Sequence, residues 1–333
     1  MIIWYNDKKS AKECYCSNRR KIKEGVVKDL KSTCKVAVVQ ASPVMFNKEA
    51  TIDKVIGIIK EASKENVELM LFPETFIPAY PRGLSFGFII GNRTMEGRED
   101  YKIYYDNAIL VPSEDTRRLG EAAKEAGAYI CIGVTERDEI SCTLYCTLLY
   151  FSPEGELVAK HRKIKPTGSE RLIWGDAHSD YLQTVSTDFG TLGGLICWEN
   201  YMPLARMALY QKGVTLYLAP TADNREEWHH TIRHIALEGR CYVLSCNQYV
   251  TKEMVPNIFK GQEDINNMPE PYCRGGSAII DPYGKYVAGP VWDKEAILYA
   301  ELDMSAIAMS RMDFDSAGHY ARPDIFDFHV TMK

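Results

Sequence analysis

Three reactive side chains stand where an apolar stretch of the sequence gives way to a loop. Glu74 follows the run LMLFP, Lys163 lies within KHRKIKPTGSERLIWG, and Cys197 follows TLGGLI. Rigid scaffolds commonly hold catalytic groups in loops at the ends of buried strands. A carboxylate that accepts a proton, a lysine that offsets negative charge and a thiol that attacks carbon together suit hydrolysis through a covalent intermediate.

Each of these residues also has an ordinary structural interpretation. Glu74 taken alone could cap backbone N–H groups in its loop, and most cysteines in a soluble protein are simply buried. The charge run around Lys163 would usually lie on a solvated face. Pro166 and Gly168 interrupt this run, however, which predicts a shaped loop, and Glu170 within it provides a partner for the lysine.

Cys197 differs from the other nine cysteines in its position. Gly193 and Gly194 precede it in an expected strand, and a helix is expected just beyond it, near 202–212. We therefore expect the helix dipole to favour the thiolate, and backbone N–H groups to bind a developing anion. The remaining cysteines lie mostly in apolar stretches, which predicts free, buried thiols rather than disulfides.

The composition excludes several classes of protein. A formal net charge of −5 gives no general basic surface, so neither nucleic acid nor an anionic membrane is expected as a partner. No apolar run reaches the roughly 18 residues of a membrane-spanning helix, and we expect a cytoplasmic protein. The cysteine pairs 14/16 and 142/146 lack companion ligands at metal-site spacing, so no metal is expected.

Strand and helix patterns alternate along most of the chain, without a linker or an internal repeat. Hairpin turns, such as those at 152–155 and 281–284, are mixed with strand–helix–strand crossovers. This mixture predicts an α/β fold with mixed sheets and outer helices rather than a purely parallel sheet. Strands are expected at 35–40, 67–73, 128–136, 143–151, 181–186, 191–196, 214–220, 241–247 and 296–302, and helices at 48–64, 113–126, 202–212, 225–239 and 303–312.

Three segments resemble the motifs of the nitrilase superfamily of carbon–nitrogen hydrolases. FPETFIPAYPRG, HRKIKPTGSERLIWG and GGLICWENYMPLAR carry Glu74, Lys163 and Cys197 in the chain order of that superfamily's Glu–Lys–Cys triad. The resemblance extends from about residue 35 to residue 326. The Trp-Glu-Asn after Cys197 and the later GHYARPD are similar to the true nitrilase branch, which includes cyanide-degrading relatives.

This resemblance implies a four-layer αββα sandwich without metal or organic cofactor, and dimers that often stack into spirals. It divides the chain into a basic arm at 1–33, a catalytic domain at 34–326 and a short tail at 327–333. It also implies that Glu170 orients Lys163 or the reacting substrate. The loop 176–180 departs from the glycine-rich and aspartate-rich turn of relatives, which concerns substrate preference or a subunit contact.

The expected reaction is the hydrolysis of an organic nitrile to a carboxylic acid and ammonia, through a thioimidate and a thioester on Cys197. Tyr80, Trp198 and Tyr201 are candidate substrate contacts, although aromatic residues as often serve packing. The alternatives are a hydratase or dihydratase acting on cyanide, and an amidase-type hydrolase with the same residues. A catalytically inactive assembly or binding module is the alternative outside enzymes.

Overall fold

The computed structural model describes residues 30–331. Most of the basic arm expected over 1–33 lies outside this range, as do Cys14 and Cys16. The chain from Lys31 onward forms one compact unit. All the residues proposed above for catalysis and substrate binding belong to that unit.

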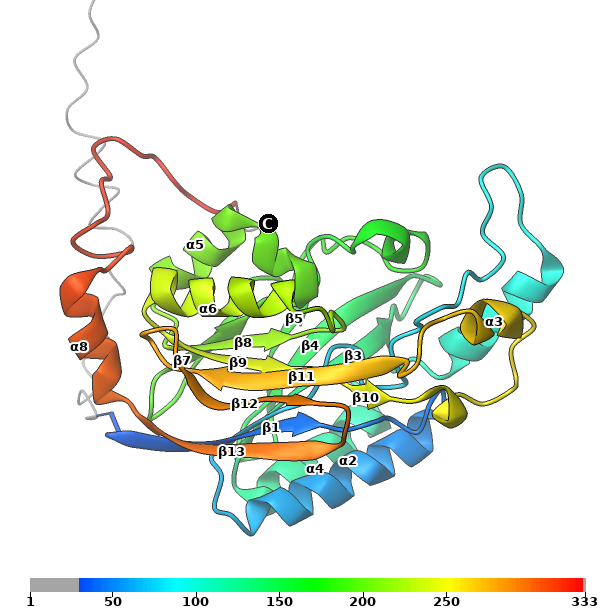
Figure 1. The fold of residues 1–333 in the computed structure, drawn as a ribbon, viewed down its shortest axis with the longest axis horizontal. Coiled ribbons are helices and arrows are strands. Elements are labelled where there is room, and N and C mark those ends of the chain that lie inside the picture. The colour runs from blue at the N-terminus through cyan, green and yellow to red at the C-terminus, as the bar shows by residue number, and fades with distance from the viewer. Residues whose placement is uncertain (1–29, 332–333) are drawn as a thin grey trace, which may run out of the picture. The chain divides into compact units, whose positions relative to one another are not determined.

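Two mixed β-sheets form the centre of this unit (Figure 1). The spatial order of the first sheet is β13 (Ala296–Asp303), β1 (Thr33–Gln40), β2 (Leu69–Leu71), β3 (Tyr129–Arg137), β4 (Leu144–Phe151) and β5 (Leu157–Arg162). The order of the second is β10 (Tyr249–Val250), β11 (Cys273–Ile280), β9 (Tyr242–Cys246), β8 (Leu216–Pro220), β7 (Thr191–Gly194) and β6 (Thr184–Ser186), with β12 (Tyr286–Trp292) on β11. In each sheet two neighbouring pairs are parallel and the others antiparallel, as the mixture of crossovers and hairpins predicts.

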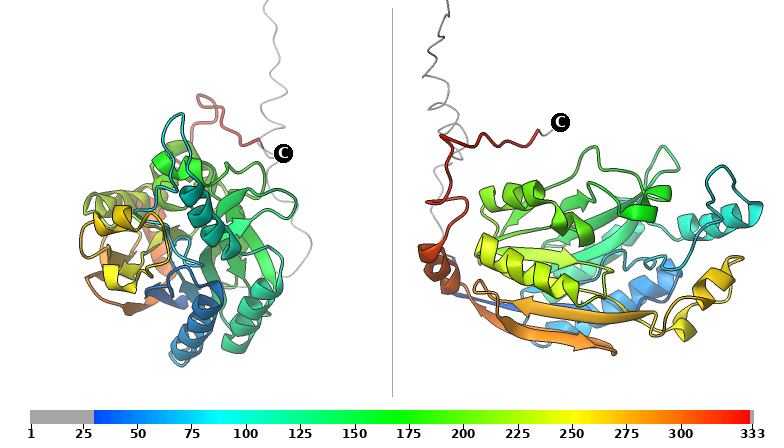
Figure 2. Two further views of the ribbon diagram at one scale, coloured as in Figure 1. Left: turned by 90° about the vertical axis from the view of Figure 1, so that its right-hand side faces the viewer. Right: turned by 45° about the horizontal axis from the view of Figure 1, so that its top comes forward.

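Helices cover the outer face of each sheet (Figures 1 and 2). The first sheet packs on α2 (Lys48–Ser63) and α4 (Glu114–Ala126), and the second on α5 (Pro203–Gln211) and α6 (Glu227–Gly239). Alternation along β1 shows the layers: Val36 and Val38 enter the core between the sheets, whereas Ala37 and Val39 join the core beneath α2 and α4. The four-layer αββα sandwich is thereby confirmed.

Local signals define the helix ends that the sequence predicts. Asn47 caps α2 by accepting a hydrogen bond from the backbone N–H of Ala50 at 3.1 Å. Ser113 begins α4, and Gly127 ends it in the left-handed conformation with φ of 62°. The last helix, α8 (Ser305–Asp313), lies within two residues of its expected bounds.

Several elements between these were not predicted. They are α3 (Met95–Asp106), α7 (Gln262–Asn266) and the short 3₁₀ helices η1 (Gly168–Leu172), η2 (Cys197–Tyr201) and η3 (Lys252–Met254). The sequence of α3 has no long apolar face; Tyr104 is fully buried in the core, and a polar contact also holds the helix. The buried carboxylate of Asp100 accepts hydrogen bonds from the backbone N–H groups of Lys260 and Gly261, at 2.7 and 2.8 Å. Such a long-range contact leaves no local pattern.

Within residues 30–331, no helix is long and apolar enough to cross a membrane. The same residues contain no cluster of three or more His, Cys, Asp or Glu side chains that could hold a metal ion. The eight cysteines in this range are free, as expected, and all of them except Cys142 are buried.

Gly133 in β3 allows the backbone around Glu74 to pass very close to the sheet. Its N–H donates a hydrogen bond to the carbonyl of Pro73 at 3.1 Å. A Cβ atom at this position would lie 2.6 Å from the backbone nitrogen of Thr75 and 2.7 Å from the Cα of Glu74. The absence of a side chain at Gly133 therefore fixes the place of the loop that carries Glu74.

Gly133→Ala should lower the free energy of unfolding by about 1–3 kcal/mol, because the new methyl group overlaps backbone atoms that cannot rotate away. Gly57→Ala is the matched control: no atom lies within 4 Å of its added Cβ in helix α2. We expect it to raise the free energy of unfolding by about 0.5–1 kcal/mol through helix propensity. Urea denaturation of both variants measures these effects, and a Gly133→Ala protein as stable as the parent would contradict the close approach.

Candidate active site

Glu74 lies three residues beyond β2, and its side chain is fully buried. Oε1 accepts hydrogen bonds from Nζ of Lys163 at 2.7 Å and from Sγ of Cys146 at 3.5 Å. Oε2 is buried and has no hydrogen-bond partner within the described residues. Burial raises the pKa of Glu74, and the charge of Lys163 opposes that shift without cancelling it. One carboxylate oxygen is thus anchored, while the other is free to take a proton.

Lys163 directly follows β5, and its ammonium group lies between two carboxylates. Its Nζ donates to Glu74 at 2.7 Å and to Glu170 at 2.8 Å, and its side chain is fully buried. Burial lowers the pKa of Lys163, but the charges of Glu74, Cys197 and Glu170 outweigh it and hold the pKa well above its ordinary value. The lysine is therefore a permanent cation and hydrogen-bond donor.

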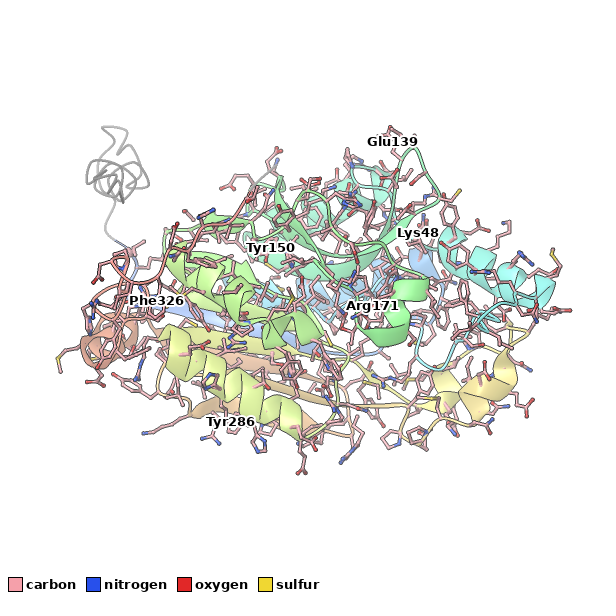
Figure 3. The ribbon with its side chains drawn as sticks, turned by 90° about the horizontal axis from the view of Figure 1, so that it is seen from above. Lys48, Glu139, Tyr150, Arg171, Tyr286 and Phe326 are labelled. Carbon is pink, nitrogen blue, oxygen red and sulfur yellow. The ribbon has the colours of Figure 1, made fainter. Side chains whose placement is uncertain are left out.

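Glu170 joins the same cluster from the 3₁₀ helix η1. Its Oε2 accepts from Lys163 and from the backbone N–H of Thr167, the latter at 2.7 Å. Its Oε1 accepts from the hydroxyl of Tyr80 at 2.7 Å. Arg171, the next residue, is exposed and marks the position of η1 in Figure 3. The charged segment around Lys163 therefore has two sides: Lys163 and Glu170 lie on the buried side, and Arg171 lies on the solvated side.

Cys197 begins η2 three residues after the end of β7, and its φ of 53° lies in the left-handed region. This strained conformation makes the chain turn sharply at the thiol. The side chain is buried, and Sγ accepts a hydrogen bond from the hydroxyl of Thr221 at 3.2 Å. Burial and the nearby charge of Glu74 raise the pKa of the Cys197 thiol.

The raised pKa of the thiol differs in direction from the sequence interpretation. We expected the dipole of a following helix to favour the thiolate. The segment at Cys197 is a single 3₁₀ turn of five residues, and the α-helix α5 begins only at Pro203. Burial therefore dominates at the thiol, which must lose its proton to a base during the reaction.

Glu199 ties the turn at Cys197 to the loop at Lys163. Its Oε2 accepts from the backbone N–H of Ile196 at 2.7 Å, and its Oε1 accepts from that of Ile164 at 2.5 Å. These backbone groups are the immediate neighbours of the candidate nucleophile and the candidate lysine. His161 also contacts Glu199 Oε2, at 2.9 Å, through Nε2. One buried carboxylate thus fixes two strand ends from different sheets.

Trp198 and Tyr201 do not join the cluster, unlike Tyr80. Both are 41% exposed. The indole N–H of Trp198 donates to Asp223 at 2.8 Å, and the guanidinium of Arg225 lies over its ring. The turn that buries Cys197 directs these aromatic neighbours to the surface, where neither lines the pocket beside Tyr80.

That pocket is lined by Tyr80 together with residues that the sequence interpretation did not propose. Those used below are Arg82, Ala222, Asn247, Tyr272 and Cys273. Cys146, Thr221 and Glu199 were also missed as site residues. Thr221 belongs to the segment APTAD and Glu199 to the motif after Cys197, so the motifs contained a signal for both, whereas Cys146 lies in an ordinary strand pattern. Only the strand order of the first sheet, in which β3 lies between β2 and β4, shows that Cys146 reaches Glu74.

Solved structures share this fold. Nit3 of Saccharomyces cerevisiae, a member of branch 10 of the nitrilase superfamily, aligns with a TM-score of 0.70 at 24% identity, over 87% of this chain and 97% of that one. A carbon-nitrogen hydrolase of Helicobacter pylori G27 aligns with a TM-score of 0.68 at 18% identity, over 89% and 97%. These likenesses show a shared fold.

Comparison of the sequence with known proteins identifies the family. The carbon-nitrogen hydrolase family model matches residues 35–312. An aliphatic nitrilase of Sinorhizobium fredii (strain HH103) is 52% identical over 89% of this chain and 95% of that protein. Nitrilase 1 of Arabidopsis thaliana is 43% identical over 91% and 87%, and the bifunctional nitrilase/nitrile hydratase NIT4A of Lupinus angustifolius is 44% identical over 90% and 86%. The chain belongs to the carbon-nitrogen hydrolase family and is an enzyme of that class.

Lys163→Met should lower the free energy of unfolding at pH 7 by about 3–5 kcal/mol, because Glu74 and Glu170 would lose the cation that they share. Lys163 lowers the pKa of Glu74, so without that cation the pKa of Glu74 rises further, the carboxyl group takes up a proton as the pH falls, and the difference from the parent should shrink towards pH 5. Urea denaturation at both pH values measures this. Lys102→Met, at an exposed pair with Asp106, is the control and should change stability little. A Lys163→Met protein with unchanged stability would contradict the buried cluster.

Proposed function

We propose that this enzyme is a nitrilase, which converts an organic nitrile to its carboxylic acid and ammonia with Cys197 as the nucleophile. The observation that carries the proposal is the buried Lys163 between Glu74 and Glu170, beside a thiol held at a strand end. The relatives named as nitrilases support the choice of nitriles within the family. The proposed catalytic domain covers residues 34–326.

The reaction begins with the addition of Sγ of Cys197 to the nitrile carbon. The thiol gives its proton to Glu74, whose Oε2 is free of other partners, and Glu74 passes this proton to the nitrile nitrogen, which forms a thioimidate and leaves Glu74 ionised. Because burial raises the pKa of the thiol, proton transfer must accompany the attack rather than precede it.

Two water molecules complete the cycle. The first, activated by Glu74, adds to the thioimidate carbon, and the resulting tetrahedral intermediate loses ammonia to leave a thioester. The second hydrolyses the thioester, which releases the carboxylic acid and restores the thiol. Lys163 remains protonated throughout, offsets the negative charge that develops, and holds Glu74 in place. Glu170 positions Lys163 through their 2.8 Å contact.

The second candidate function is hydration, in which an amide is the product. A tetrahedral intermediate that expels the Cys197 thiolate instead of ammonia releases the amide. The relatives named as bifunctional nitrilase/nitrile hydratase favour this candidate over an inactive assembly module. Measuring the ratio of ammonia to amide with organic nitriles, with cyanide and amides as controls, separates the candidates.

The substrate is a small molecule. We further propose a cytoplasmic homodimer that can extend into a spiral. Exposed apolar side chains on η2 and at the start of α5 support a subunit contact there: Trp198, Tyr201, Met202 and Leu204. The loop 176–180 does not line the pocket, but it contacts both the surface and the site: Asp176 pairs with Lys165 at 2.6 Å, and the backbone N–H of Ala177 donates to the carbonyl of Lys163 at 3.3 Å.

Cys197→Ala should reduce nitrile turnover by on the order of 10⁴-fold or more, as expected when a covalent nucleophile is lost. Glu74→Gln should lose nearly as much, because the amide cannot accept the thiol proton. Cys241→Ala is the matched control, since Cys241 is also a buried thiol but lies in the core beneath α5 and α6. Ammonia release measures all three, and full turnover by the Cys197→Ala protein would exclude the proposed nucleophile.

The acid limb of kcat/KM for an uncharged nitrile should lie above pH 4.5, the ordinary pKa of a glutamate. Glu74 must be ionised to accept the proton of Cys197, and burial raises its pKa, so activity falls earlier than usual as the pH decreases. A profile of initial rates from pH 4 to pH 8 measures the limb. A flat profile down to pH 4.5 would mean that Glu74 is not the base.

A further inference from the structure

The pocket beside the cluster contains a cation that the proposed reaction does not use. Arg82 lines this pocket and is partly buried. Within residues 30–331 its guanidinium donates only from Nη2, to the carbonyl of Ala222 and to Sγ of Cys273, the latter at 3.9 Å. No Asp or Glu of the described chain forms an ion pair with it. Its Nε and Nη1 therefore have no protein partner, and a guanidinium in such a place usually has an anion.

The hydroxyl group of Tyr272, in the same pocket, also lacks a hydrogen-bond partner among the described residues, which is an observation independent of Arg82. The side chain of Tyr272 is 2% exposed. The hydroxyl lies next to the backbone that follows Arg82, since a Cβ atom built on Gly83 would be 3.3 Å away. Buried hydroxyl groups are rarely left unsatisfied, so this one is explained best by a ligand.

Two residues that line the pocket also adjoin the reacting centre. Tyr80 lines it and also donates to Glu170 of the cluster at 2.7 Å. Ala222, another lining residue, directly follows Thr221, whose hydroxyl binds Sγ of Cys197. A molecule whose nitrile carbon meets Cys197 can therefore extend its other end towards Arg82 and Tyr272.

We propose that Arg82 and Tyr272 bind a carboxylate at the far end of the substrate, so that the enzyme prefers cyano-carboxylic acids to uncharged nitriles. This inference rests on the proposed nitrilase function. Guanidinium N–H groups and a phenol O–H are all donors that suit the acceptor oxygens of a carboxylate. An anionic substrate also needs such a cation, because Glu74 and Glu170 would otherwise repel it from the pocket.

Two other roles for Arg82 lead to different results. If it only supports the carbonyl of Ala222, its loss affects every nitrile alike through Thr221 and Cys197. If it acts on the reacting carbon, its loss again affects charged and uncharged nitriles equally. The ratio of kcat/KM for a charged substrate to that for an uncharged one of the same shape separates selective recognition from both.

The test compares cyano-carboxylates, NC–(CH₂)n–CO₂⁻ with n from 1 to 4, with nitriles that carry an isopropyl group in place of the carboxylate. At the best chain length, the wild-type enzyme should favour the acid by at least about tenfold, as one charge-assisted hydrogen bond allows. Arg82→Met should reduce the ratio by about 10–100-fold, and Arg82→Lys should retain part of it. Tyr272→Phe should reduce it by about fivefold.

Tyr150→Phe is the matched control for the tyrosine variant. The hydroxyl of Tyr150 is also buried without a partner, but it lies in β4 away from η1, as the labels of Tyr150 and Arg171 show in Figure 3. This variant should leave the ratio unchanged. Because the Tyr272 hydroxyl has no partner to lose, Tyr272→Phe tests the inference even if Arg82→Met folds poorly.

The outcomes distinguish the two levels of the proposal. Carboxylate recognition would be overturned if the wild-type enzyme preferred the uncharged nitriles. It would also be overturned if Arg82→Met and Tyr272→Phe lowered kcat/KM equally for both substrates. Either result would leave the nitrilase proposal intact. If the wild-type enzyme releases neither ammonia nor amide from any of these nitriles, the nitrilase proposal fails, and the inference fails with it.

Discussion

The shared ammonium of Lys163 is the interaction on which the rest of the site depends. Removing three charged groups from water carries a large free-energy cost, which only mutual attraction and additional hydrogen bonds can offset. Those additional bonds come from Thr167, Tyr80 and Cys146, each from a different part of the chain. The cluster therefore exists only when the first sheet, the loop that carries Tyr80 and η1 are correctly folded, and its geometry is rigid as a result.

The sandwich brings the cluster and the thiol together by two kinds of contact. At Gly133 and Gly194 the missing side chains let neighbouring backbone approach, next to Glu74 and next to β8 respectively. At Glu199 a buried carboxylate receives backbone N–H groups from both sides of the site. The first kind of contact sets the distance between elements, and the second sets the orientation of the residues at their ends. Neither touches the substrate directly.

The sequence predicts the layers and the main reactive groups because both depend on local patterns. A continuous apolar run marks β1, a cap and a glycine mark α4, and strand ends mark Glu74 and Cys197. Local sequence patterns do not predict features that depend on contacts between residues far apart in the chain. The support of α3 by Asp100, the reach of Cys146 to Glu74, and the burial that overrides any helix dipole at Cys197 all follow from packing. The surface positions of Trp198 and Tyr201 likewise follow from a left-handed residue that no propensity indicates.

Temperature acts differently on the centre of this molecule and on its outer layers. The hydration free energy of charged groups becomes less favourable on heating, so the cost of keeping Lys163 and its two carboxylates away from water decreases. The apolar faces of α2 and α4 gain no comparable advantage, and they join the sheet through a separate core. Heat should therefore loosen the outer helices before it separates the charges at the centre, and loss of the enzyme on warming would begin at its periphery.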